Sequence, residues 1–361
     1  MAVQDNVDLA AAQAHRPGTN YVRWLEQIPA AYWVVAAVLL FMPAVANDFW
    51  LFQVWGWAFI LGMIALSLMF LGGYGGMVSL AQMTIAAVGG YMVAILGTSS
   101  VDAVSLGWPL WLAVIVAIIV AMLFGTATGA LAVRTRGIYT IMITLAVAAG
   151  FFYFTRQNYT IFNGYSGFPG IRPPDAFGIR WRGPIPFYYL TLSCAVLSYL
   201  AVVYVSRSPF GLALQGIRDN PRRMSALGYN VVAHRIAAYS FASVIAAVGG
   251  ILLVWQNAQI SPGTAGIGPV IDILVIAIAG GLAHPIGPFI GALIYVVLRT
   301  FSPEMLVAVG LPGDRFQTLI GLGFLAVVFW SPDGVLGLWE RFRQRFHTAR
   351  QLARSGESER P

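Results

Sequence analysis

Residues 103–133 read AVSLGWPLWLAVIVAIIVAMLFGTATGALAV, and no position in this run carries a charged side chain. A helix that crosses a lipid bilayer needs about 20 consecutive apolar residues. The run is therefore long enough to span a membrane once. Similar runs recur on both sides of it, so the unit of construction in this chain is the membrane-spanning helix.

The composition of the whole chain agrees with this interpretation. Of the 361 residues, 58% are hydrophobic and 10% are charged. Soluble domains average about 45–50% apolar and about 25% charged residues. So few charges could not keep a chain of this size in solution. The composition thus excludes a soluble enzyme and a disordered protein.

The apolar runs predict an all-α polytopic membrane protein with about ten transmembrane helices, some of them short or broken. We expect a fold between two spans at Gly72–Gly76 and a break at Gly280–Pro285, and the piece near residues 270–282 would suit a re-entrant segment or half of a broken helix. The runs are Ala31–Ala46, Phe49–Val101 (two spans), Ala103–Val133, Gly137–Thr155, Gly183–Ser206, Ile236–Ile271, Ile273–Leu298 (two short pieces) and Phe316–Trp330.

The arginine residues predict the orientation of this bundle. With ten crossings, 15 of the 21 basic residues lie on the side of the two termini, and the positive-inside rule makes that side cytoplasmic. Residues 156–185 fit less well, because they carry four arginines on the outer side. The predicted organisation is a cytoplasmic tail at 1–30, a transmembrane domain at 31–332 with a cytoplasmic loop at 207–235, and an Arg-rich cytoplasmic tail at 333–361.

Several kinds of chemistry have no residues to support them. All 21 basic residues are arginine, so a P-loop ATPase, which needs its lysine, is excluded. The single cysteine, Cys194, permits no disulfide framework, and the four histidines lie in separate loops or tails, so we expect no metal site and no catalytic residues. The scattered charge favours lipid headgroups over nucleic acid as a partner.

Ionisable residues inside the apolar runs are few. Asp272, His284 and Arg299 all lie near predicted helix ends, where a charge reaches the membrane surface at small cost. Proton-coupled carriers usually place an acidic residue or a histidine at the middle of a span. The pattern therefore argues against ion coupling.

The cytoplasmic loop Ser206–Arg235 predicts two short helices. The first should run over about Gly211–Arg218. The second should begin with Asn220 as N-cap and Pro221 at the first helical position, and it should end at Gly228. Such a capped, basic pair at a membrane surface is either a docking element or a solvated loop against lipid headgroups. The apolar positions Met224 and Leu227 are three apart, as one face of an interfacial helix requires.

Glycine and proline mark two further features. The pairs Gly72/Gly76, Gly125/Gly129 and Gly287/Gly291 are each four apart, which favours ordinary close packing of helices over a thin-walled pathway. Residues 261–269 are rich in proline and glycine and cannot form a straight helix. On the outer side, this segment would be a gate, a docking surface for a binding protein or a plain hairpin.

Four stretches in order resemble the bacterial ABC importer permeases for branched-chain amino acids. They are the loop with its continuation to Phe241, and the stretches Gly72–Gln82, Arg134–Ala146 and Gly280–Ala292. Together they cover roughly Leu51–Thr300. The Arg-Gly-Ile-Tyr and Arg-Asp-Asn elements make the chain more similar to the LivM type of permease, although residues 221–224 and 283–285 depart from the family pattern.

The resemblance implies a division of labour among several chains. This chain and a second permease chain would form the path for a branched-chain or other hydrophobic amino acid. Two cytoplasmic ABC ATPase subunits would consume the ATP, so this chain would bind no cofactor, and a periplasmic solute-binding protein would deliver the solute. Coupling to the ATPase would involve Gly211, Arg218, Asp219, Asn220, Arg222, Arg223, Leu227 and Gly228. A pathway or gate would involve Gly72, Gly76, Gln82, Pro262, Gly263 and Gly281.

Three alternatives remain open from the sequence. Permeases for urea and short-chain amides are close relatives and share the Leu-Gly-Tyr-Asn found at Leu227–Asn230. A stand-alone secondary carrier or channel would need no ATPase. A polytopic enzyme would show clusters of polar residues in the middle of its spans.

Overall fold

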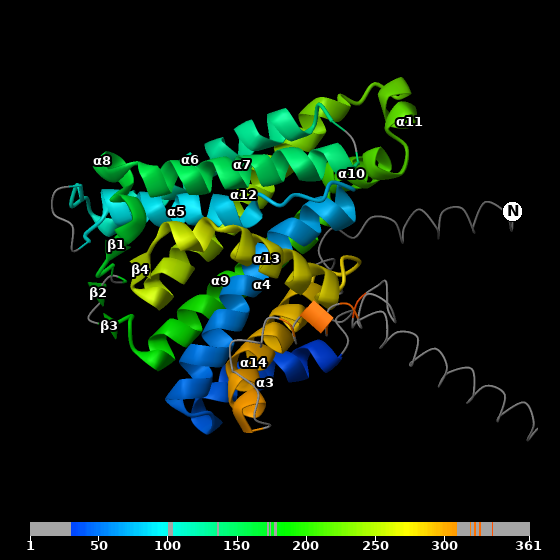
Figure 1. Ribbon diagram of the computed structural model, residues 1–361. Coiled ribbons are helices and arrows are strands. Elements are labelled where there is room, and N and C mark those ends of the chain that lie inside the picture. Colours follow the sequence, from blue (N-terminus) through cyan, green and yellow to red (C-terminus); the bar gives the residue numbers. More distant parts are fainter. Residues whose placement is uncertain are drawn as a thin grey trace, which may run out of the picture. The chain divides into compact units, whose positions relative to one another are not determined.

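The structure is a computed structural model that describes residues 30–99, 104–135, 137–171, 173, 175–176 and 179–308 and the single positions 318, 321, 322, 325 and 334. The predicted tails at 1–30 and 333–361 and the predicted span Phe316–Trp330 therefore lie almost wholly outside the described residues. The all-α prediction is confirmed, because helices make up most of the described chain (Figure 1). Two units are distinguished, residues 1–47 and 48–361.

The first unit contributes one described helix, α3 (Ala30–Val45), which has Pro43 inside it. The second unit holds all the other elements. Its first half contains η1 (Trp50–Gly56), α4 (Trp57–Met69), η2 (Phe70–Tyr74), α5 (Gln82–Leu96), α6 (Leu110–Ala132), α7 (Ile138–Gln157), α8 (Tyr159–Phe162), η3 (Gly164–Ser166), β1 (Phe168–Pro169), β2 (Asp175–Ala176) and β3 (Ile179–Arg180). Its second half contains α9 (Pro184–Arg207), α10 (Pro209–Asp219), α11 (Pro221–Ala226), α12 (Val231–Asn257), β4 (Gln259–Ile260), η4 (Pro262–Ala265), α13 (Ile267–Gly280) and α14 (Gly287–Ala308).

Five helical segments are long and apolar enough to cross a membrane. They are Trp50–Tyr74, which joins η1, α4 and η2, and the helices α6, α7, α9 and α12. The shorter apolar helices α5 and α13 have 15 and 14 residues. The chain is thus a multi-pass membrane protein.

The centre of the second unit is built around α12, which packs against α4, α5 and α6. Small residues allow these helices to approach closely. A Cβ at Gly125 of α6 would collide with Ser243 of α12, and a Cβ at Gly129 would lie 2.5 Å from Cβ of Tyr239. The prediction that this glycine pair serves close packing is confirmed. The pair Gly287/Gly291 likewise lies against the backbone of α13.

The outer helices expose apolar side chains instead of burying them. Trp111 and Leu123 of α6, Met142 of α7 and Leu197 of α9 are all more than half exposed. An apolar surface of this extent on a chain with several spanning helices is suited to contact with lipid tails.

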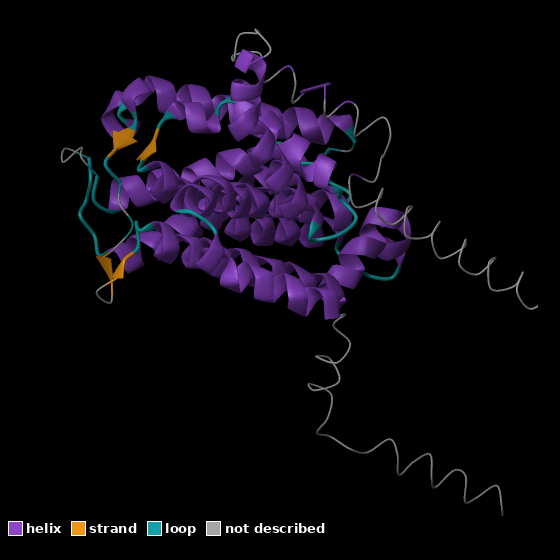
Figure 2. Ribbon diagram, turned by 90° about the horizontal axis from the view of Figure 1, so that it is seen from below, coloured by secondary structure: helices purple, strands orange, loops and turns teal. Residues whose placement is uncertain are grey.

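The two ends of the helical unit differ in structure. At one end β1 pairs with β4, with Phe168 opposite Ile260, so residues from the loop 156–185 lie beside the start of the Pro/Gly-rich segment. At the other end lie α10 and α11 (Figure 1). Figure 2 shows that all four short strands are confined to one end of the helices. The loop 156–185 and the segment 261–269 therefore share one side, as predicted, opposite the loop 207–235.

Candidate functional site

The predicted helix pair of the loop 207–235 is present. α10 begins at Pro209, two residues before the predicted start, because Ser208 is its N-cap and its Oγ accepts a hydrogen bond from the Gly211 amide at 3.3 Å. α11 begins as predicted, with the Asn220 side chain accepting from the Arg223 amide at 3.0 Å. It ends before Gly228, whose φ of +89° favours glycine.

Gly211 makes the tight turn between α9 and α10. A Cβ at this position would lie 2.6 Å from Cα of Ser206 and would also collide with the Val205 carbonyl oxygen. A larger residue would therefore move α10 away from the end of α9. This gives the predicted coupling residue Gly211 a steric role in placing the whole loop.

α11 folds back on α10, and this separates its two apolar side chains. The Met224 sulfur packs beside Gly216, where an added Cβ would lie 2.8 Å from it. Leu227 is 67% exposed. Met224 thus packs within the loop, whereas Leu227, the residue that follows α11, is left exposed.

The loop presents a basic surface with an exposed leucine. The side chains of the predicted coupling residues Asp219, Asn220, Arg222, Arg223 and Leu227 are all exposed. Asp219 accepts from Arg218 Nε at 2.8 Å, a surface ion pair of the kind worth about 0–1 kcal/mol. These residues are thus available to another chain.

Arg218 connects this loop to the first glycine-rich bend. Its Nη1 donates to the carbonyl oxygen of Gly73 at 2.5 Å, across 145 residues of sequence. Its side-chain stem fills the space next to Gly76, where an added Cβ would lie 2.6 Å from Arg218 Cγ. Gly76 also has a φ of +66°, so both the backbone conformation and the contact with Arg218 require glycine there. A predicted coupling residue and a predicted gate residue are in contact.

The same bend touches the break between α13 and α14. A Cβ at Gly73 would overlap the carbonyl oxygen of Leu282, whereas a Cβ at Gly72 would lie 3.8 Å from the Leu282 side chain, at ordinary contact distance. Gly281 begins this break with a φ of +107°. We call the set Arg218, Gly73, Gly76 and Leu282 the bend contact.

Gln82, another of the predicted gate residues, lies between α4 and α5. It is fully buried at the start of α5, and its Oε1 accepts a hydrogen bond from Ser67 Oγ of α4 at 2.9 Å. In the described part of the chain its Nε2 has no partner. Gln82 thus ties α4 to α5 and does not line the cavity described next.

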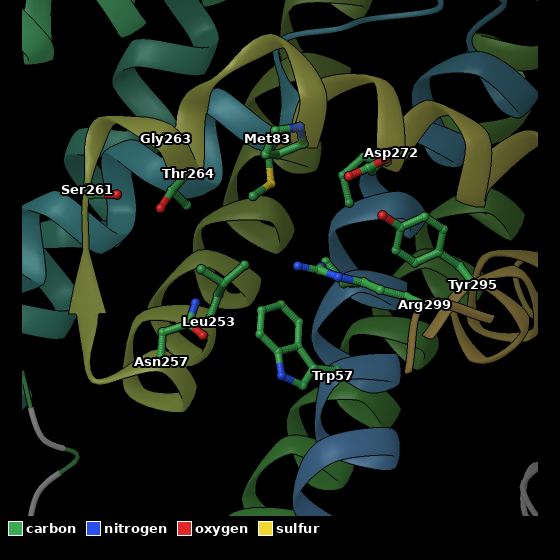
Figure 3. A pocket seen from close by; sticks show the side chains of 13 residues that line it. Trp57, Met83, Leu253, Asn257, Ser261, Gly263, Thr264, Asp272, Tyr295 and Arg299 are labelled. Atoms are coloured by element: carbon green, nitrogen blue, oxygen red, sulfur yellow. The ribbon is translucent and has the colours of Figure 1, made fainter. Parts of the chain in front are cut away.

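A cavity of about 270 Å³ lies towards the end of the unit that carries the short strands (Figure 3). Residues of α4, α5, α12, η4, α13 and α14 line it. Its walls are apolar at Trp57, Leu61 and Leu253. Of the predicted gate residues, Gly263 lines the cavity and Pro262 is buried at the start of η4.

Charged side chains of opposite sign face this cavity. Asp272 comes from α13 and Arg299 from α14, and the Tyr295 hydroxyl lies within hydrogen-bonding reach of the Asp272 carboxylate. The Arg299 guanidinium lies 5.5 Å from the centroid of the Trp57 ring. Figure 3 shows the guanidinium pointing into the space between Trp57 and Met83.

The placement of Arg299 corrects an expectation from the sequence. We expected the apolar run to end at Leu298, with Arg299 at its edge. α14 instead continues to Ala308, so Arg299 lies inside the helix and its side chain reaches a cavity. The signal that was available is the spacing of Tyr295 and Arg299, four residues apart and therefore on one helix face.

Apart from Gln82, which lies between α4 and α5, the predicted gate residues fall into two groups. Gly72, Gly76 and Gly281 lie at the bend contact, and Pro262 and Gly263 lie at the cavity end, with α13 between the two groups. A helix of 14 residues is about 21 Å long. α13 and α14 therefore run from the bend contact to the cavity. Among the described residues, no group of three His, Cys, Asp or Glu side chains could hold a metal ion.

Comparison with known proteins identifies the family of transport proteins to which this chain belongs. A family described as "Branched-chain amino acid transport system / permease component" matches residues 50–328, which is more than half of the chain. The chain belongs to this family of transport permeases. No solved structure matches it.

Three relatives illustrate the range of the similarity. A probable branched-chain amino acid transport permease protein LivM of Methanocaldococcus jannaschii is 24% identical over 62% of this chain and 68% of its own length. The high-affinity branched-chain amino acid transport system permease protein LivM of Escherichia coli is 21% identical over 73% of this chain and 63% of its own length. The ribose import permease protein RbsC of Haemophilus influenzae is 20% identical over 57% of this chain and 64% of its own length. This chain thus spans roughly two thirds of these relatives.

Proposed function

We propose that this chain is a permease subunit of an ABC importer for a branched-chain or other hydrophobic amino acid. The family match over residues 50–328 carries this proposal, and the first relatives named above are permeases for branched-chain amino acids. In this proposal a second permease chain completes the transmembrane path. The protein lies in the bacterial inner membrane with both termini in the cytoplasm, and membrane lipid covers its outer helices.

The bend contact supports a mechanism for coupling. Two ATPase subunits hold α10 and α11 through exposed residues such as Leu227, Arg222 and Arg223, and they consume the ATP, so this chain binds no cofactor of its own. When they close, the loop moves as a unit, because Gly211 and the Met224–Gly216 packing fix it. Arg218 then pulls or pushes the bend at Gly73, and the bend displaces the α13–α14 break.

The opposite end of the unit suits the arrival of the solute. A periplasmic binding protein would dock near β1, β4 and η4, which lie at the end away from α10 and α11. The solute would enter near the cavity, and the helices α13 and α14 link that region to the bend contact. One movement at the cytoplasmic loop would therefore change the path at the other end.

Leu227→Arg tests the coupling assignment. Because the exposed Leu227 side chain should lie in a groove of the ATPase, a buried unpaired guanidinium there should lower ATP-driven uptake of labelled leucine by at least about tenfold. The measurement is uptake and ATP hydrolysis in proteoliposomes that hold both permease chains, the ATPases and the binding protein. Hydrolysis should continue while uptake falls.

The matched control is Leu227→Met, which keeps an apolar side chain of similar volume and should transport normally. If Leu227→Arg also transports normally with tightly bound ATPase, the coupling assignment is wrong. Concentrative flux through this chain alone, without any companion subunit, would contradict the whole proposal, and uptake of urea in place of leucine would favour the amide-permease alternative.

A further inference from the structure

We propose that the cavity lined by Asp272 and Arg299 is a binding site for a zwitterionic α-amino acid. Asp272 would hold the ammonium group, Arg299 would hold the carboxylate, and the apolar wall would receive the side chain. This inference rests on the proposed function and assigns to it a site within a single permease chain.

The two charges are arranged to receive a solute. Asp272 is half-buried and Arg299 is exposed, so both polar groups are accessible from the cavity. The Arg299 charge is near enough to act on the Asp272 carboxylate. In the part of the chain that the structure describes, however, no direct ion pair joins them: Asp272 faces the Tyr295 hydroxyl, and Arg299 lies against the Trp57 ring. Each charge therefore keeps hydrogen-bonding capacity for another molecule.

The location of these charges makes them unusual in this chain. Only 10% of all residues are charged, and charged groups that face a cavity of a membrane protein typically mark substrate pathways. The carboxylate and the guanidinium come from adjacent helices, α13 and α14, and both line one space. Two opposite charges in one cavity match the two ends of an amino-acid backbone.

The remaining lining suits an apolar side chain. Leu61 and Leu253 are buried and Trp57 is partly buried, and all three line the cavity. In Figure 3, Trp57 and Leu253 lie across the space from Asp272, while Asn257 and Thr264 add polar groups at the strand end. The volume of about 270 Å³ is near the lower end of the range of ligand pockets, as expected for a small solute.

The same charges discriminate between classes of solute. A neutral sugar would displace water from Asp272 and Arg299 without offering a compensating charge to either, which is unfavourable. A zwitterion would satisfy both at once. The cavity therefore favours an amino acid over a sugar, although a ribose permease is among the relatives of this chain.

The test matches each protein charge with one charge of the solute. Binding of tritiated L-leucine is measured on the complex of permease and ATPase subunits in lipid nanodiscs, without ATP and without the binding protein. Leucinamide lacks the carboxylate and N-acetyl-leucine lacks the ammonium group, and each serves as a competitor. Because a hydrogen bond to a charged group is lost, Arg299→Gln and Asp272→Asn should each weaken leucine binding at least about tenfold.

The decisive result is which competitor keeps its affinity in which variant. Arg299→Gln should leave the affinity for leucinamide unchanged, because that competitor never used the guanidinium. Asp272→Asn should leave the affinity for N-acetyl-leucine unchanged for the corresponding reason. The control Glu304→Gln changes an exposed charge on α14 that does not line the cavity, and it should alter none of the three affinities.

Other outcomes overturn the proposal. Leucine affinities that stay at the wild-type value in both variants would show that the cavity is not the site. An equal loss for all three compounds in both variants would mean that Asp272 and Arg299 only maintain the structure. If the complete importer drives leucine uptake but the wild-type permease binds no leucine, the cavity assignment fails and the proposed function stands. If the importer takes up ribose or urea and no leucine, the proposed function itself fails.

Discussion

The two ends of the helical unit depend on different kinds of interaction. The bend contact consists of glycine backbone and one long side chain, and it depends on close approach, with Arg218 donating to the Gly73 carbonyl. The cavity consists of side chains from six elements, and it depends on charge and shape, with Asp272 and Arg299 facing one space. One region is suited to transmitting a displacement and the other to recognising a solute.

This difference makes opposite demands on the sequence. At the bend contact an added methyl group should do more harm than the loss of a charge, because backbone atoms cannot move aside. At the cavity the loss of a charge should do more harm than a modest change in volume, because the space is partly empty. Substitutions at the two ends therefore test whether the ends depend on different interactions.

The largest effect is expected for Gly73→Ala. Its Cβ would overlap the Leu282 carbonyl oxygen, so the bend and the α13–α14 break must separate, which should destabilise the protein by about 1–3 kcal/mol. ATP-driven uptake should also be lost. The measurement is thermal unfolding of the purified permease together with uptake in proteoliposomes.

Gly72→Ala is the matched control for this change. The added Cβ would lie 3.8 Å from its nearest neighbours, Leu282 and Val78, so stability and uptake should stay close to wild type. Equal effects of the two substitutions would mean that loss of glycine flexibility, and not the contact with Leu282, determines the result.

A smaller effect is expected for Arg218→Gln. This change removes the hydrogen bond to Gly73, worth about 0.5–1.5 kcal/mol, together with the surface ion pair to Asp219, and it shortens the stem that packs beside Gly76. The protein should stay folded, and the number of solute molecules moved per ATP should fall by about threefold to tenfold. Arg207→Gln, at the exposed end of α9, is the control and should leave this ratio unchanged. A normal ratio in Arg218→Gln would show that movement does not pass through the bend contact.

Local signals allowed much of the loop to be predicted from the sequence. Asn220 followed by proline marked the start of α11, and Gly228 marked its end, because caps depend on residues within one helical turn. The bend at Gly72–Gly76 was predicted for the same reason, since consecutive glycines weaken a helix wherever they occur. The start of α10 was missed by two residues, although Ser208 and Pro209 carried the signal.

The cavity could not be predicted in this way. Trp57, Asp272 and Arg299 are far apart in the sequence, and only the packing of α4, α13 and α14 brings them together. The hydropathy pattern placed both charges at helix ends, because it cannot show that α14 continues beyond Arg299 or that its side chain has a cavity to enter. The contact between Arg218 and Gly73, across 145 residues, is equally a product of tertiary structure.

The smallest effect is expected for Trp57→Leu at the cavity. This change removes the ring that lies 5.5 Å from the Arg299 guanidinium and so loosens the orientation of that group. A cation–π contact at an accessible site is worth about 0.5–1 kcal/mol, so leucine affinity should fall by about twofold to fivefold while folding is unaffected. The measurement is the same nanodisc binding assay, with Trp55→Leu as control, because Trp55 packs on Phe59 and does not line the cavity.

A double substitution separates the two explanations of that loss. If the Trp57 ring acts through Arg299, adding Trp57→Leu to Arg299→Gln should weaken leucine binding no further, since the orienting contact has already gone. A further twofold to fivefold loss would assign the effect of the ring to the shape of the apolar wall. If Trp57→Leu lowered stability and uptake as much as Gly73→Ala is expected to do, the two ends would not differ in their dependence on close backbone packing and on charge.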